Sequence, residues 1–279
     1  MQQVLYEHIL YTMQIVSNKQ NIMPKDLLGR SLAYNCFLPR LSDKTYLYEN
    51  LKSENTLKKA LYSNAKTLAK VIQTNKIEHN GIESRELACV LFDDSNMAYE
   101  NEKYMDPLDY LSMIRRLLPF FIIHDSIFID EYQILESAIG GADMIVLEIS
   151  YLLAYCHCIY ALENNPMLLD FNIPDIVLQI ANEYNLVANS IKDSINIATK
   201  THIDKFISFA YNLGLIPIVC IQNKEDLELL HTLHNFPHCI YVPYDMIDLL
   251  PKESIIFAKS NKDNRHLQHK SIDVLIVSS

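Results

Sequence analysis

Glycine-rich motifs, long apolar runs and clusters of basic residues are all missing from this sequence. The chain has 279 residues and only five glycines: Gly29, Gly81, Gly140, Gly141 and Gly214. Neither GxGxxG nor the P-loop pattern occurs, so the common glycine-rich nucleotide-binding folds have no support. No run of about eighteen apolar residues occurs either, and this argues against a membrane span.

The charge distribution disfavours a nucleic-acid partner. The formal net charge is −10, and the lysines and arginines do not gather in one segment. The first residues, MQQVLYEHILYTMQ, have no cationic leader and are interrupted by Glu7 and His8, unlike a secretory signal. We therefore expect a cytoplasmic protein that binds neither nucleic acid nor membranes.

The six cysteines do not form a recognisable framework. They are scattered, and most lie inside apolar runs, where a thiol behaves as a small hydrophobe. In the segment CHC, Cys156 and Cys158 flank His157, but one intervening residue makes the two thiols poor partners on one metal, and no second ligand pair follows. The segment predicts ordinary thiols at a helix start or in a loop, and no metal site.

Short β-branched and aromatic runs alternate with stretches of helical period. The runs are TYLYENL at Thr45, ELACVLFDD at Glu86, PFFIIHD at Pro119, ADMIVLEIS at Ala142, IPIVCIQ at Ile216, HCIYVP at His238, SIIFAKS at Ser254 and DVLIVSS at Asp273. Eight such βα units in a chain with 49% apolar residues favour a single closed (β/α)8 barrel, of the TIM-barrel type, spanning residues 1–279.

Three departures from a minimal barrel are expected. Residues 1–43 form an N-terminal helical extension, and residues 154–200 form a helical insertion after strand four, which acts as a lid or packs on the rim. The last strand reaches Ser279 with no eighth helix behind it. Apolar barrel surface on the strand-eight side is then covered by the N-terminal segment or by a second copy in a homo-oligomer.

The segment FIDEYQILESAIGGADMIVLEISYL resembles the third helix and fourth strand of indole-3-glycerol phosphate synthase, a family that typically reads KDF, then IID-YQI, then a Gly-Ala-Asp strand. TYLYENLK is similar to that family's first strand with its essential glutamate. CVLFDD resembles the second strand, and NLGLIPIVCIQNKEDLELL the fifth strand and its helix. The resemblance implies a ring closure with decarboxylation of a carboxyphenylamino deoxyribulose phosphate, without a cofactor.

The resemblance implies catalytic positions that are only partly kept. Glu49 matches the first-strand glutamate, and Lys52 lies next to the place of a substrate-binding lysine. Asp125 falls on the catalytic lysine of KDF, which reverses the charge of the proton donor. Alternation along a strand allows only one of His124 and Asp125 to face the site. A cation returns at Lys259, either as a relocated acid or, as we prefer, paired with Asp125 or Glu49.

At the other positions that the resemblance implies, most of the family's residues are replaced. The fifth-strand glutamate falls on Cys220 and the sixth-strand asparagine on Pro243. Ser260 is kept in the seventh-strand motif, as a substrate-binding residue. The phosphate would meet Asn261, Ser278 and Ser279 in loops that lack glycine.

Two functions remain open at this point, with a third behind them. The first is a divergent indole-3-glycerol phosphate synthase of tryptophan biosynthesis, with Lys259 or Lys52 as the acid. The second, which the substitutions favour, is a barrel that has lost this reaction and binds a ligand or partner protein. Another activity on a phosphorylated sugar is the third.

Overall fold

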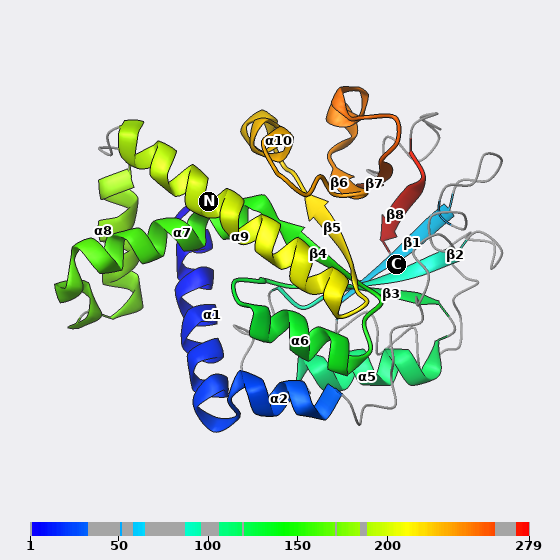
Figure 1. The fold of residues 1–279 in the computed structure, drawn as a ribbon, viewed down its shortest axis with the longest axis horizontal. Helices are drawn as coiled ribbons and strands as arrows, with labels where there is room; N and C mark the ends of the chain where they lie inside the picture. Colours follow the sequence, from blue (N-terminus) through cyan, green and yellow to red (C-terminus); the bar gives the residue numbers. More distant parts are fainter. Residues whose placement is uncertain are drawn as a thin grey trace.

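The fold is a closed barrel of eight parallel strands paired in sequence order, with β8 returning to β1. The computed structural model describes residues 2–32, 51, 58–64, 87–95, 106–118, 120–170, 172–184, 189–259 and 272–278. The strands are β1 Lys58–Asn64, β2 Leu87–Asp93, β3 Phe121–Asp125, β4 Met144–Glu148, β5 Ile216–Cys220, β6 Cys239–Val242, β7 Ile255–Lys259 and β8 Val274–Ser278. Figure 1 shows the strands β1 to β5 and β8 converging around one axis. The predicted (β/α)8 class is confirmed.

Seven of the strands lie where the apolar runs predict them, but the first does not. The run at Thr45 is outside the described residues except for Leu51, which is helical and fully buried. The first strand is instead KKALYSN, in which only Ala60, Leu61 and Tyr62 form an apolar core between polar residues. Glu49, which the resemblance puts at the end of the first strand, lies outside the described residues.

Two apolar cores lie on opposite sides of the barrel wall. The inner core is formed by alternate strand residues, including Leu91, Ile123, Val146, Ile218, Phe257 and Ile276. The outer core lies between the strands and the surrounding helices, and includes Phe92, Ile122, Ile145, Val219 and Ile240. Because neighbouring residues of a strand face opposite sides, this burial pattern fixes which side chains at the strand ends point into the barrel.

Local capping signals set the helix that follows β3. Helix α6, Glu131–Gly140, begins with a capping box in which Asp130 accepts from the backbone and Gln133 closes back on the cap. The residue that caps its C-terminus is Gly141, whose φ of 98° lies in the left-handed region that glycine tolerates best. This segment carries the family resemblance, and its helix boundaries follow directly from these residues.

Three α-helices lie between β4 and β5, where a minimal unit has one. They are α7 Ile149–Asn164, α8 Ile173–Tyr184 and α9 Asn189–Asn212, with a 3-10 turn, η3 Pro166–Asp170, after α7. The boundary expected at residue 200 falls inside α9, so the added segment runs without a break into the helix before β5. The next helix along the chain is α10, Lys224–His231, and η4, Tyr244–Leu249, follows β6.

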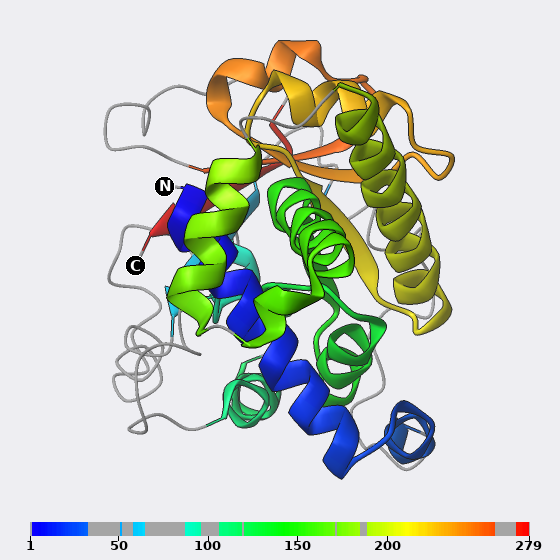
Figure 2. The same ribbon diagram turned by 90° about the vertical axis from the view of Figure 1, so that its left-hand side faces the viewer.

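The N-terminal segment packs on these added helices. Helix α1, Gln2–Ile22, contacts α7 and α8, and α2, Lys25–Leu32, contacts α6 (Figure 2). Tyr6, Ile9 and Leu10 of α1 are buried against Ala154, Cys158 and Ile176. In the part of the chain that the structure describes, no helix is both long and apolar enough to cross a bilayer.

A buried ion pair ties β4 to its neighbours. The guanidinium of Arg115 in α5, Pro107–Leu117, lies 2.9 and 3.0 Å from the two carboxylate oxygens of Asp143. Asp143 is fully buried, and one of its oxygens also accepts the backbone N–H of Ile122 at 2.9 Å. One carboxylate thus joins α5, β3 and the start of β4.

Replacing Arg115 by alanine would remove the guanidinium that lies 2.9 Å from the buried Asp143 carboxylate. We expect the Arg115→Ala variant to lose about 3–5 kcal/mol of unfolding free energy, measured by urea denaturation at pH about 7. Arg116→Ala, at the exposed neighbouring position of the same helix, serves as control and should cost about 1 kcal/mol or less. Equal losses in the two variants would contradict this role for the ion pair.

Candidate functional site

Polar side chains close the inner core at the carboxyl ends of the strands. The inward positions end in Tyr62, Asp93, Asp125, Glu148, Cys220, Tyr241 and Lys259, on β1 to β7 in order. Each follows the alternation of the inner core: Leu91 precedes Asp93, Ile123 precedes Asp125 and Val146 precedes Glu148 by two residues. Active sites of such barrels are built at this end, so this ring is the candidate site, and we call it the barrel mouth.

Three neighbouring strands of the mouth end in carboxylates. Asp93 and Asp125 are register partners on β2 and β3, and Glu148 ends the adjacent β4. Burial raises the pKa of Asp125 well above its usual range, and the negative charges of Asp93, Glu148 and Asp94 raise it further, against the opposing charge of Lys259. The position where the resemblance puts the catalytic lysine therefore holds a carboxyl group that retains its proton to unusually high pH.

Tyr62 and Lys259 occupy the opposite side of these carboxylates. The Tyr62 hydroxyl donates a short hydrogen bond to Asp93. The ammonium of Lys259 lies 4.9 Å from the centre of the Tyr62 ring, and its side chain is exposed. Among the described residues, no direct ion pair joins Lys259 to Asp125, so the predicted pairing of these two side chains is not found. The alternative partner, Glu49, lies outside the described residues.

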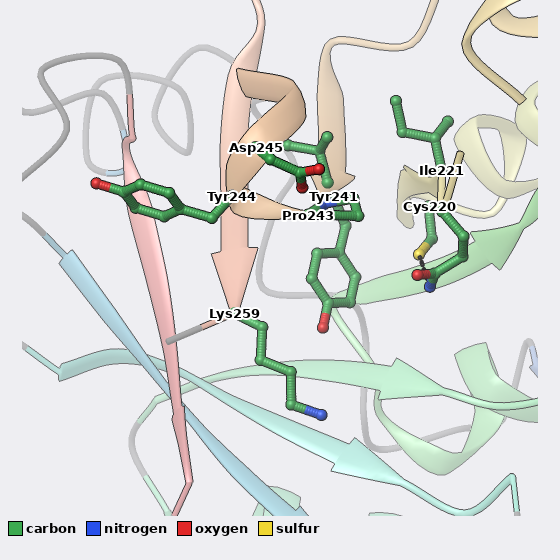
Figure 3. Close-up of a pocket in the computed structure, with 9 residues that line it drawn as sticks. Cys220, Ile221, Tyr241, Pro243, Tyr244, Asp245 and Lys259 are labelled. Atoms are coloured by element: carbon green, nitrogen blue, oxygen red, sulfur yellow. Dashed lines mark hydrogen bonds between the residues drawn. The ribbon is translucent and has the colours of Figure 1, made fainter. Parts of the chain in front are cut away.

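The far side of the mouth is a cavity of about 420 Å³ lined by residues of β5, β6 and β7. Figure 3 shows Tyr241 and Lys259 pointing into the same space, while Tyr244 points away from it. The Cys220 thiol accepts from the Gln222 amide at 3.2 Å, and burial raises its pKa well above the usual value. Cys220 is thus a neutral thiol where the resemblance implies an acidic glutamate.

His124 points out of the barrel, as alternation predicts for the neighbour of Asp125. Its ring stacks on Phe92 with 6.0 Å between centres, and Nδ1 lies 2.8 Å from the Ser137 hydroxyl. Nε2 lies 3.2 Å from the Asp94 carboxylate. His124 therefore joins β3 to α6 and does not face the mouth.

The CHC segment lies in the middle of α7, not at a helix start or in a loop as expected. Helical backbone here follows from the long apolar stretch around it, which packs on α1 and α9. Burial raises the pKa of Cys156 and raises that of Cys158 to about 12. Within the described ranges, no group of three His, Cys, Asp or Glu side chains is arranged to hold a metal ion.

The remaining predicted site residues are not placed. Lys52, Ser260, Asn261 and Ser279 lie outside the described residues, and Ser278 is described only as part of β8.

Four residues of the barrel mouth were not predicted as site residues from the sequence: Asp93, Glu148, Tyr62 and Tyr241. The two acids carry the same signal as Asp125, since each closes an apolar run at the end of a predicted strand.

Comparison with known proteins connects this barrel to one family of enzymes. Indole-3-glycerol phosphate synthase of Campylobacter jejuni is 23% identical over 91% of this chain and 85% of that protein. The synthase of Campylobacter hominis is 28% identical over 98% of this chain and 92% of that protein. This chain is a divergent relative of the indole-3-glycerol phosphate synthases. No protein-family model matches it.

Among solved structures, the α-subunit of tryptophan synthase from Pyrococcus furiosus aligns with a TM-score of 0.41 and 11% identity, over 79% of this chain and 86% of that chain. The fold is established by the strand pairing of the barrel itself.

The raised pKa of Asp125 predicts a pH-dependent effect of removing its charge. In the unfolded chain the carboxyl ionises near its ordinary pKa, and in the folded protein it ionises at higher pH. The folded state therefore loses stability as the pH rises between these two values, and the loss persists above them. Asparagine does not ionise, so Asp125→Asn should be more stable relative to the parent at pH about 8 than at pH about 4.

Urea denaturation of both proteins at the two pH values measures this difference. Asp175→Asn, at an exposed position of α8, is the control and should show no comparable pH dependence. A stability difference between Asp125→Asn and the parent that is the same at the two pH values, or that favours the variant more at the lower pH, would contradict the assignment.

Proposed function

We propose that this chain is an indole-3-glycerol phosphate synthase-like barrel in which the ring-closing reaction is impaired or lost, and whose mouth serves in ligand binding. One observation carries the proposal: Asp125, with Asp93 and Glu148 beside it, stands where the resemblance puts the lysine that acts as general acid. Both relatives quoted above are named indole-3-glycerol phosphate synthase.

The chemistry of the reaction supports this proposal. Ring closure needs a proton donor on the substrate ketone, and loss of a general acid typically costs about 10²–10⁴-fold in rate. The substrate also carries a phosphate and a carboxylate. Among the described residues, the mouth sets Asp93, Asp125 and Glu148 against the single ammonium group of Lys259. Each of these carboxyl groups repels such an anion when it is ionised, whereas a synthase site has to attract the anion.

A working synthase is the second candidate, and one observation favours it. Because Asp125 holds its proton to unusually high pH, its carboxyl group has a proton to donate. Lysine and protonated aspartic acid both serve as general acids when their pKa is suitable, so the substitution alone does not exclude catalysis. In this case Asp125 would be the catalytic acid, and Lys259 would attract the substrate.

The two candidates are separated by complementation of a tryptophan auxotroph that lacks the synthase. We expect no growth with this chain, although the protein is soluble and folded, and growth with the Campylobacter hominis relative expressed in the same way. The purified chain should likewise form no indole product, followed by fluorescence, above the rate without protein.

Growth that is abolished by Asp125→Asn would overturn the proposal and identify Asp125 as the acid. Growth that survives Asp125→Asn but is abolished by Lys259→Met would also overturn it, and would assign the proton to Lys259.

A further inference from the structure

A second and larger cavity lies beside the barrel mouth, among the helices added after β4. Its volume is about 1050 Å³, and its walls come from α1, α7, α9, α10, the end of β4 and the segment after β5. Gln222 lines both this cavity and the smaller cavity of the barrel mouth. Glu148 also lines this cavity and is one of the residues of the barrel mouth. We call this larger cavity the side cavity. Its volume is at the upper end of the range for small-molecule sites.

The inner wall of the side cavity is apolar and fixed. Tyr6, Ile149 and Ala154 line it and are 3%, 1% and 3% exposed. They belong to α1 and α7, two helices that pack directly on one another. Exposed Ile197 of α9 extends the apolar lining to the rim. This wall suits the apolar body of a ligand.

The charges around the side cavity have one dominant sign. Among the described residues that line it, five are acidic and one, Lys200, carries an ammonium group; the acids are Glu148, Asp193, Glu225, Asp226 and Glu228. Asp226 is only 3% exposed and accepts the Gln222 backbone N–H at 2.7 Å. Glu148 accepts a hydrogen bond from the Ser150 hydroxyl. Two of the acids are thus held in place at the inner, mouth-facing end of the cavity.

The histidine in this cavity does not offset the acids. His157 Nδ1 lies 3.0 Å from the Tyr6 hydroxyl, and both side chains are buried. Burial, helped by the charge of Lys192, lowers the pKa of His157 to about 4, so the ring is neutral at pH about 7. The cavity therefore combines an apolar wall with a net negative field.

We propose that the side cavity binds a small organic cation, a primary amine carried on an apolar aromatic or aliphatic frame. The frame lies on Tyr6, Ile149 and Ala154, and the ammonium group lies toward Glu148 and Asp226. Ionised carboxylates provide charge-assisted hydrogen bonds to an ammonium group and repel a carboxylate of the same shape. Although Glu148 also belongs to the barrel mouth, the proposal does not depend on whether the ring-closing reaction survives.

Three probes of nearly equal shape test the charge requirement. The full chain is titrated by calorimetry with 4-phenylbutylamine, 4-phenylbutanol and 4-phenylbutyrate. We expect the amine to bind with a dissociation constant below about 1 mM, at least about tenfold more tightly than the alcohol, and the carboxylate not to bind. Equal binding of the three probes, or no binding of the amine in this range, would overturn the proposal.

Two matched variants test the location. Ile197→Lys puts a cation at the cavity rim at an exposed helix position and should weaken amine binding at least about threefold while leaving the fold intact. Leu178→Lys makes the same change on the exposed face of α8, away from the cavity, and should leave the affinity unchanged.

Glu148→Gln removes the half-buried carboxyl group at the inner end and should weaken amine binding about tenfold or more. An amine affinity that responds to Glu148→Gln but not to Ile197→Lys would place the amine in the barrel mouth and overturn the side-cavity site. Affinity that is indifferent to both variants would place it elsewhere on the protein.

Discussion

The crowding of like charges at the ends of β2, β3 and β4 is the constraint on which the rest of the site depends. Asp93, Asp125 and Glu148 have to face inward, because the residues two positions earlier in each strand fill the inner core. A register shift that separated the acids would expose that core. The strands therefore hold three carboxyl groups together, and burial and the neighbouring negative charges raise the pKa of Asp125 well above its usual range.

The mouth compensates this charge only in part. Tyr62 donates to Asp93, and its own pKa is raised by burial and by that hydrogen bond, so it remains a donor. Lys259 lies over the Tyr62 ring and lowers the pKa of Asp125 from a distance. Among the described residues, Lys259 is the cation that opposes the carboxyl groups of the mouth.

The barrel could be predicted from the sequence because seven of its strands are strong apolar runs bounded by polar residues. The first strand could not, since KKALYSN has a shorter apolar core than the aromatic run near Thr45. In the site, Asp125 stood out because it ends an apolar strand, and alternation correctly allowed only one of His124 and Asp125 to face the mouth. The raised pKa of Asp125 was not predictable, because it depends on distances between three strands that no single segment encodes.

The added helices change the surroundings of the mouth more than the barrel itself. Helix α7 begins directly after Glu148, and α1 packs on it, so the chain builds a second cavity that shares Glu148 and Gln222 with the mouth region. Burial also raises the pKa of Glu148, with Asp226 and Asp93 adding to the effect and the Ser150 hydroxyl opposing it. The pKa of Glu148 thus depends on charges in both the side cavity and the barrel mouth.

Carboxyl-carbon NMR on aspartate-labelled protein, with the Asp125 signal assigned by its loss in Asp125→Asn, tests the central claim most directly. We expect the Asp125 carboxyl to titrate well above the ordinary aspartate pKa, and to titrate at lower pH once Asp93→Asn removes its register partner. An Asp125 signal that titrates at the ordinary value and does not respond to Asp93→Asn would contradict the account.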